Sequence, residues 1–336
     1  MRYELTGVVD VHTHIVPADF PAYPGRHNNH AWPSMCEATC GHRHILIRGA
    51  IFRTLSPAAW DAERRIAEMD RAGIGLQALS PMPELLSYWF DPDDALAMAE
   101  FVNATIAAMV DAAPHRFVGL GMVPLQDPDR AIDVLQALMR DARFRGIEVG
   151  TNVNGVPIGD ARFEPLFAEA ERLGAAVFVH ALHPVGDERL IGPPLLKAIV
   201  SFPCETAFAV ASLITGGLLS RHPRLKIAFS HGGGAFASVL PRLQHGWKIL
   251  RPLAQSLSEA PIEIARRLYY DTLVYDAATL RHLVSLFGAE QLLVGTDYPF
   301  EIHDRDPLGS LAAAGLPAEV EALITRDNPA RFLGYR

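Results

Sequence analysis

Two histidines near the amino terminus are the residues of this chain whose type and spacing best suit chemistry. They lie in the segment Asp10-Val11-His12-Thr13-His14, at the end of a short apolar run. Alternate residues of a strand point to the same face, so we expect the two imidazoles to lie side by side. Paired imidazoles suit Zn²⁺ or a similar divalent ion. The alternative is a pair of surface histidines.

Three more polar residues follow apolar runs elsewhere in the chain. His180 ends AAVFVH, His231 comes directly after IAFS and before three glycines, and Asp297 lies two residues beyond LLVG. A single histidine after a strand is usually structural. Side chains at the carboxyl ends of several parallel strands, however, meet at one edge of the sheet. We therefore expect these residues to converge with the two amino-terminal histidines in one metal site.

Eight short apolar runs recur along the 336 residues and must form the elements that position this site. Near-continuous apolar runs are typical of parallel strands buried on both faces, and their alternation with helices favours an α/β fold. Eight repeats favour a closed (β/α)₈ TIM barrel of the metal-dependent hydrolase type. The alternative is an open doubly wound sheet. The predicted strands are Gly7–His14, Gly73–Ser80, Phe117–Val123, Gly146–Val149, Ala175–His180, Leu225–Ser230, Leu268–Asp271 and Leu292–Gly295.

The connections between the predicted strands are expected to be helical, with two exceptions. Residues 18–56, rich in Pro, Asn, His and Arg, form an insertion after the first strand. An insertion of this length on a barrel is usually an active-site lid or a subunit contact. Residues 182–206 form the second interruption, and no linker divides the chain, so we expect one domain over residues 1–336. The clearest predicted helices are Asp94–Ala113, Pro128–Arg140, Phe163–Leu173 and Ala277–Phe287.

The composition indicates a large buried core and excludes several classes of partner. Hydrophobic residues make up 49% of the chain, and its formal net charge of −8 argues against nucleic-acid binding. Three cysteines without disulfide-framework spacing fit a reducing compartment. The first residues lack the features of a signal peptide, and no apolar run approaches the roughly 18 residues needed to span a bilayer. We therefore expect a cytoplasmic protein with no nucleic-acid and no membrane partner.

The same residues carry a resemblance to a known family. His-x-His after the first strand, single histidines after the fifth and sixth, and an aspartate after the eighth resemble the amidohydrolase superfamily. Within that superfamily, the chain is similar to the aminocarboxymuconate-semialdehyde decarboxylase-like group. The segments that carry this closer similarity are DVHTHIVP, FRTLSPAAWDAERRIAEMD, VPLQDPD, SHGGGAFASVLPR, YYDTLVYD and LLVGTDYPF.

The resemblance implies a role for each residue of the predicted metal site. His12, His14, His180 and Asp297 would bind one divalent ion per subunit, which would be Zn²⁺, or else Mn²⁺ or another divalent metal. His231 would lie just outside the ligand set and act as the acid and base of the reaction, because an imidazole titrates near neutral pH.

Three further side chains gain roles from the resemblance. Arg53 would hold a substrate carboxylate bidentately, unless it is a surface residue of the insertion. Arg242 would reach the site of the neighbouring subunit, which requires a homodimer, or would be an ordinary helix-surface arginine. Glu148 would either bridge a second ion, as in binuclear members, or hydrogen-bond pocket groups near a single metal.

These roles predict a metal-dependent, nonoxidative decarboxylase, that is, a carboxy-lyase, which acts on a small aromatic or muconate-type carboxylic acid in aromatic catabolism. The alternative is a hydrolase or hydratase that uses metal-bound hydroxide on a C=O or a conjugated C=C bond. A non-catalytic binding protein is a third hypothesis, against which the intact ligand set argues. After His180 the chain reads ALHP where the group has Pro-Trp, so we expect a substrate other than aminocarboxymuconate semialdehyde.

Overall fold

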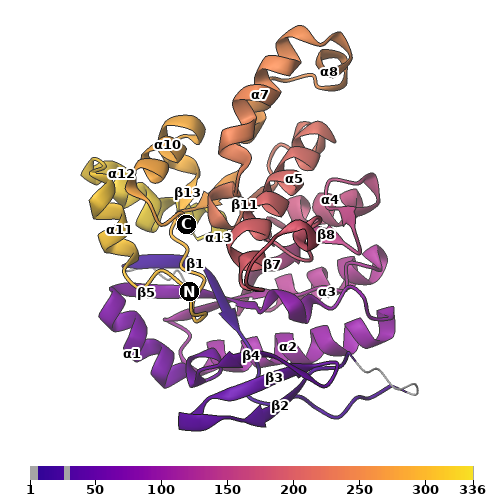
Figure 1. The fold of residues 1–336 in the computed structure, drawn as a ribbon, viewed down its shortest axis with the longest axis vertical. Coiled ribbons are helices and arrows are strands. Elements are labelled where there is room, and N and C mark those ends of the chain that lie inside the picture. The colour runs from indigo at the N-terminus through magenta and orange to yellow at the C-terminus, as the bar shows by residue number, and fades with distance from the viewer. Residues whose placement is uncertain (1–6, 26–30, 336) are drawn as a thin grey trace.

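Eight parallel strands form a ring at the centre of the molecule. Figure 1 shows helices around these strands. The computed structural model describes residues 7–25 and 31–335. Each predicted strand is present, and each pairs with the next in chain order, which confirms the predicted barrel. Strands buried on both faces explain why the apolar runs are nearly continuous. The eight strands are β1 (Val8–Ile15), β5 (Ile74–Pro81), β6 (Phe117–Gly121), β7 (Phe144–Gly150), β10 (Ala176–His180), β11 (Lys226–Phe229), β12 (Tyr269–Asp271) and β13 (Leu292–Leu293).

Backbone hydrogen bonds between the first strand and the segment around and after the last strand close the ring. The amide of Val11 donates to the carbonyl of Val294 at 2.9 Å, and the amide of Asp297 donates to the carbonyl of His12 at 2.9 Å. The residues that close the barrel therefore also bring Asp297 against the strand that carries the paired histidines.

Helices cover the outside of the ring, and the predicted ones are confirmed to within two residues. The helix predicted at Pro128–Arg140 begins where expected. The side chain of Asp127 accepts a hydrogen bond from the amide of Arg130, and Pro128 occupies the first turn. The helices that correspond to the predictions are α2 (Pro92–Ala112), α3 (Pro128–Arg140), α4 (Glu164–Leu173) and α10 (Ala277–Phe287).

The other helices complete the outer layer, and one pair extends beyond it. In Figure 1, α7 and α8 project away from the barrel at the top of the view. These other helices are α1 (Ala62–Ala72), α5 (Phe202–Thr215), α6 (Leu218–Arg221), α7 (Phe236–Ile249), α8 (Arg251–Ser256), α9 (Pro261–Ala265), α11 (Pro307–Ala314), α12 (Ala318–Ala322) and α13 (Asn328–Leu333).

The insertion at residues 18–56 contains a small antiparallel sheet that the sequence analysis did not predict. Its strands are β2 (Ser34–Glu37), β3 (Arg43–Ile47) and β4 (Ala50–Leu55), and it lies at the lower edge of the barrel in Figure 1. Most of its side chains are at least partly exposed, so the strands lack the apolar pattern that marks those of the barrel. A further short hairpin joins β8 (Asn152–Val153) to β9 (Val156–Pro157).

The second interruption, residues 182–206, is irregular only in its first part. The chain becomes helical at residues 197–201 and continues into α5, so the expectation of a non-helical stretch up to residue 206 was wrong. Four prolines in this segment are typical of a loop, but Pro203 is the second residue of α5, within the helical stretch.

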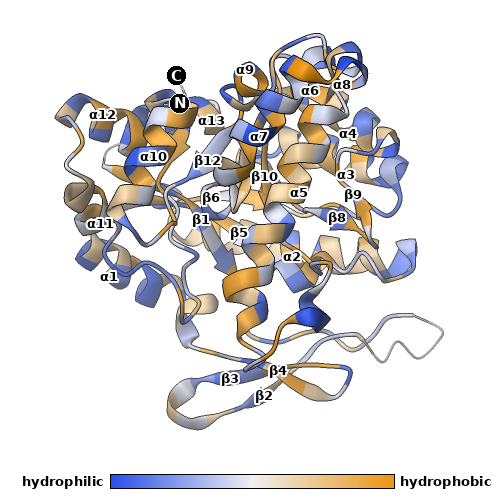
Figure 2. Cartoon of the chain, turned by 45° about the horizontal axis from the view of Figure 1, so that its top comes forward, coloured by the Kyte–Doolittle hydropathy of each residue, from blue (hydrophilic) through white to orange (hydrophobic). Residues whose placement is uncertain are grey.

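Two helical segments, Pro92–Ala112 and Lys197–Thr215, have the length and apolar composition of a membrane span. Half of the most apolar window of each is buried inside the protein, as in a core helix. In Figure 2, α5 and the strand β10 are coloured mainly as hydrophobic, whereas hydrophilic residues are prominent on outer helices such as α1.

A fully buried arginine ties α1 to the strand that carries the paired histidines. The guanidinium of Arg65 donates to the carbonyls of Ala58 and His14 and to the side chains of Thr13 and Gln77. Buried carbonyl oxygens are costly to leave without a donor, so this one side chain satisfies several groups directly behind the predicted site.

We expect replacement of Arg65 by leucine to lower the free energy of unfolding by about 2–4 kcal/mol, because its partners would lose their donor. Urea unfolding followed by circular dichroism would measure the change. The matched control is Arg64→Leu, which removes a half-exposed guanidinium from the same helix and should change stability by at most about 0.5 kcal/mol. Equal effects of the two substitutions would contradict the role of Arg65.

Candidate metal centre

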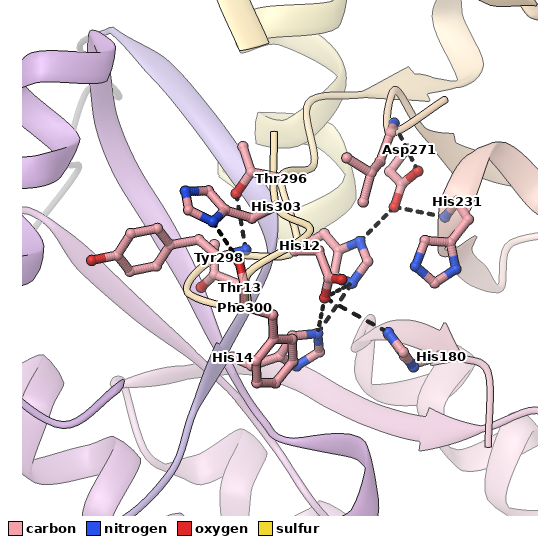
Figure 3. A network of polar contacts seen from close by, with 12 residues as sticks. His12, Thr13, His14, His180, His231, Asp271, Thr296, Tyr298, Phe300 and His303 are labelled. Carbon is pink, nitrogen blue, oxygen red and sulfur yellow. Dashed lines mark hydrogen bonds and ion pairs between the residues drawn. The ribbon is translucent and has the colours of Figure 1, made fainter. Parts of the chain in front are cut away.

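Three histidines and one aspartate meet at the carboxyl end of the barrel. Figure 3 shows the rings of His12, His14 and His180 close together. His12 and His14 extend from β1, His180 ends β10, and Asp297 follows β13. One potential ligand atom from each side chain lies within 4.8 Å of the others, and all four residues are buried. The structure therefore brings together the four residues that the sequence analysis named as ligands.

Hydrogen bonds on the outer side of two rings determine which nitrogen faces the centre. His14 Nδ1 donates to the carbonyl of Pro81 at 2.9 Å, and His180 Nδ1 donates to the carbonyl of Ala181 at 2.9 Å. Because a carbonyl oxygen only accepts, each Nδ1 carries the proton of the neutral ring. Each Nε2 is left with a lone pair directed inward.

A buried carboxylate orients the third ring. His12 Nδ1 donates to Asp271 at the end of β12, with only 2.6 Å between nitrogen and oxygen. Asp271 also accepts the backbone amides of His231 at 3.0 Å and Gly232 at 2.8 Å. Burial alone would raise the pKa of Asp271, but the hydrogen bond from His12 holds it below the usual value. Asp271 is therefore an anion that fixes the orientation of a ligand without touching the centre itself.

The inward atoms are arranged as a cation would require. His12 Nε2 lies 3.1 Å from His14 Nε2, and Asp297 Oδ1 lies 3.4 Å and 3.0 Å from these two nitrogens. His180 Nε2 is buried without a hydrogen-bond partner among the described residues. Lone pairs that face one another repel unless a positive charge lies between them. Three imidazole nitrogens and one carboxylate oxygen therefore fit a divalent ion.

His231 lies beside the four residues and not among them. Its ring centre is 5.4 Å from that of His12 and 5.2 Å from that of His180. Burial lowers the pKa of His231 from its usual value, so the ring is neutral at neutral pH. Within the described part of the chain its Nδ1 has no hydrogen-bond partner. The geometry leaves this imidazole free to exchange a proton with a ligand.

A cavity of about 400 Å³ opens onto the candidate metal centre. Arg53 of β4 lines it, with the guanidinium carbon 4.1 Å from the centre of the Phe300 ring. Among the described residues, Arg53 has no carboxylate within ion-pair distance. Arg242, by contrast, is exposed on α7 and is absent from the described residues that line this cavity. Within one subunit, the structure thus places Arg53 at the site and Arg242 away from it.

Glu148 of β7 is buried on the outer side of the centre. Its Oε2 lies 3.7 Å from His14 Nδ1, the nitrogen that faces away from the other ligands. Burial raises the pKa of Glu148 well above its usual value. In the parts of the chain that the structure describes, the group of potential ligands does not include this residue. The arrangement favours a single ion over a bridged pair.

Two residues of the site escaped the sequence analysis. Asp271 ends a predicted strand, as the named ligands do, so its position at a carboxyl end was a signal that could have identified it. Phe300 stacks on the ring of His14, with centres 5.0 Å apart, and on Arg53. Nothing in an isolated phenylalanine after a strand distinguishes this role from core packing.

A closed barrel whose strands 1, 5 and 8 supply three histidines and an aspartate defines a class of metal-dependent barrel proteins. The chain matches the family described as amidohydrolase over residues 9–335, and it belongs to that family. This finding confirms the resemblance inferred from the motifs.

Individual relatives refine this placement. The chain is 36% identical to 2-amino-3-carboxymuconate-6-semialdehyde decarboxylase of Dictyostelium discoideum, over 95% of this chain and 88% of the relative. The solved structure of 5-carboxyvanillate decarboxylase from Sphingomonas paucimobilis is similar with a TM-score of 0.74 and 28% identity, over 81% of this chain and 83% of that one. The IDCase of Metarhizium anisopliae shares the fold, with a TM-score of 0.83 at 20% identity, over 98% and 97% of the two chains.

We expect Asp271→Asn to weaken the binding of a divalent ion about 10- to 100-fold, because the neutral amide no longer orients and polarises His12. Calorimetric titration of the ion-free protein with Mn²⁺ would give the dissociation constants. Asp276→Asn, at the exposed start of α10, is the matched control and should leave the affinity unchanged. Equal affinities for Asp271→Asn and the wild-type protein would contradict this orienting role.

Proposed function

We propose that this protein is a metal-dependent, nonoxidative decarboxylase, a carboxy-lyase, of small aromatic or muconate-type carboxylic acids. The observation that carries the proposal is the guanidinium of Arg53, which has no ion-pair partner among the described residues and faces the same cavity as the candidate metal centre. A cation at this place suits an acid as substrate. The two relatives at 36% and 28% identity, both decarboxylases by name, support the same reaction class.

Arg53 binds the carboxylate of the substrate in this proposal. A guanidinium pairs with a carboxylate through two parallel hydrogen bonds, which fix the plane of the group to be lost. The stacked ring of Phe300 limits the positions that the guanidinium can adopt. When bound, a divalent ion on His12, His14, His180 and Asp297 supplies electrophilic polarisation of a substrate oxygen.

His231 carries the proton that the reaction needs. Breaking the bond to CO₂ leaves an electron pair on carbon, which must be taken up by a proton. The neutral imidazole accepts a proton from the substrate or from water and returns it to that carbon. Its place beside the ligands, with a free ring nitrogen, suits this exchange.

The proposal includes one divalent ion per subunit and a homodimer. The nitrogen-rich ligand set suits Zn²⁺, and Mn²⁺ or another divalent ion is compatible with it. In the homodimer, Arg242 of each subunit reaches the site of its partner. Its exposure on the projecting helix α7, beside exposed apolar side chains such as Val239 and Ile249, supports this contact.

The remaining predictions concern organisation and location. We propose that residues 1–336 form one domain and that the insertion at residues 18–56 covers the site, since its strand β4 carries Arg53 to the cavity. The three cysteines are free, as expected for a reducing compartment, and location in the cytoplasm stays a prediction.

We expect the metal-loaded protein to release CO₂ from at least one member of a panel of hydroxybenzoates, aminobenzoates and muconates. Gas-phase detection of CO₂ gives the rate, and the chelator-treated protein is the control, in which release should stop. A hydrolase or hydratase would instead convert a lactone or a conjugated acid without any CO₂, and that result would overturn the decarboxylase.

We expect His231→Asn to keep its full metal content while the rate of CO₂ release falls by about two orders of magnitude or more, because the proton carrier is lost. Elemental analysis and the CO₂ assay measure the two quantities. His282→Asn, at an exposed position of α10, is the matched control and should retain both. Undiminished activity in His231→Asn would remove the acid and base role.

A further inference from the structure

A second carboxylate faces the cavity and has no place in the reaction described above. Glu84 lies in the helical turn Pro83–Leu86 that follows β5, and its side chain lines the cavity that holds the candidate metal centre. It also lines an adjoining cavity of about 340 Å³. Its own backbone amide donates a hydrogen bond to the carboxylate, and no side chain among the described residues pairs with it. Glu84 therefore stands at the junction of two cavities with its acceptor oxygens available to a ligand.

Glu84 and His231 lie on opposite sides of the barrel mouth. Glu84 follows β5, the second strand of the ring, whereas His231 follows β11, the sixth. In a ring of eight strands these two positions face each other. A substrate whose reacting carbon lies near His231 and the metal ligands consequently turns its opposite edge toward Glu84.

The surroundings of Glu84 keep it as an acceptor. Burial raises the pKa of Glu84, and the charges of Arg53 and Lys197 act against that rise. A carboxyl group accepts a hydrogen bond through its carbonyl oxygen even when it is protonated. The carboxyl oxygens of Glu84 keep lone pairs beyond the one that accepts from the backbone amide of Glu84, so a ligand that donates a hydrogen bond here gains more than one that merely fills the space.

The adjoining cavity has the character of a pocket for a flat substituent. The rings of Trp89 and His183 stack in its wall, with centres 4.6 Å apart, and Ile51 and Phe52 of β4 line it as well. Arg48 lines this cavity too, so the two charged groups Glu84 and Arg48, and not the apolar walls, distinguish one small substituent from another in this region.

We propose, building on the decarboxylase assigned above, that Glu84 determines substrate specificity. It selects acids that carry an amino or hydroxyl donor on the edge remote from His231, and its charge offsets the attraction that Arg48 exerts on a second carboxylate there. The donor binds the Glu84 oxygens while Arg53 holds the carboxylate that is lost. A like charge next to Glu84 would meet repulsion in place of a hydrogen bond.

Binding of matched benzoates to the metal-loaded protein tests this proposal without relying on turnover. The probes are 3- and 4-aminobenzoate, 3- and 4-hydroxybenzoate, the methylbenzoates of the same shape, and isophthalate and terephthalate. We expect wild type to bind the best amino or hydroxy acid at least about tenfold more tightly than its methyl counterpart. Isothermal titration calorimetry gives the dissociation constants.

Two variants of Glu84 separate its chemistry from its shape. In Glu84→Leu the ratio of the dissociation constants of the methyl acid and the donor acid should fall to about one. The affinity for the methylbenzoates should be kept or increased. In Glu84→Gln, which removes the charge but keeps an acceptor, part of the hydroxyl preference should remain and the dicarboxylates should bind more tightly. Glu100→Gln, at an exposed position of α2, is the charge-matched control and should behave as wild type. Metal content and melting temperature show that each variant is folded.

The outcomes distinguish this inference from the function on which it rests. An unchanged donor preference in Glu84→Leu overturns the role of Glu84 and leaves the decarboxylase untouched. If wild type binds none of the benzoates while Mn²⁺ binds normally, and CO₂ is released from no acid of the panel, the proposed function fails and the inference fails with it.

Discussion

The structure depends on inward-facing nitrogen lone pairs that would repel one another without a cation. Three imidazoles stay in this arrangement because each outer nitrogen is held from behind, by Pro81, by Ala181 and by the Asp271 carboxylate. Two of these supports are backbone carbonyls at the ends of β5 and β10. The barrel therefore does more than carry the ligands on its strands. Its backbone also sets the tautomer in which they are presented.

The requirement to hold the ligands explains why polar groups are buried so densely around the first strand. The segment that closes the barrel brings Asp297 to His12 through a backbone hydrogen bond. Arg65 of α1 donates a hydrogen bond to the carbonyl of His14 in the same strand. Loss of either contact would shift a ligand by the small distances that decide metal affinity. The contacts that close the barrel therefore also set the geometry of the candidate metal centre.

The parts of the molecule that could be predicted from the sequence are those whose structure follows from a single physical requirement, such as burial. Burial on both faces produced eight recognisable apolar runs, and the carboxyl ends of these runs identified the ligands. The exposed strands β2–β4 carry no such pattern. Residues 182–206 contain four prolines and were predicted as an interruption, although the chain is helical from residue 197 on. Asp271 was missed because an aspartate at a strand end resembles a loop residue until its hydrogen-bond partner is known. Glu84 lies in a turn whose direction depends on tertiary packing alone.

Two groups of residues with different proposed roles surround the mouth of the barrel. The residues that would bind the ion and move the proton come from β1, from β10 and from the segments after β11 and β13. Those that would hold and select the acid come from the turn after β5 and from the insertion, which supplies Arg53 and the apolar wall of the second cavity. The second group lies on connections, whose residues change without disturbing the strand ends. A change of substrate on this scaffold therefore requires no change in the metal ligands, which is why a chain that keeps the ligand set intact can depart from its relatives in the pocket.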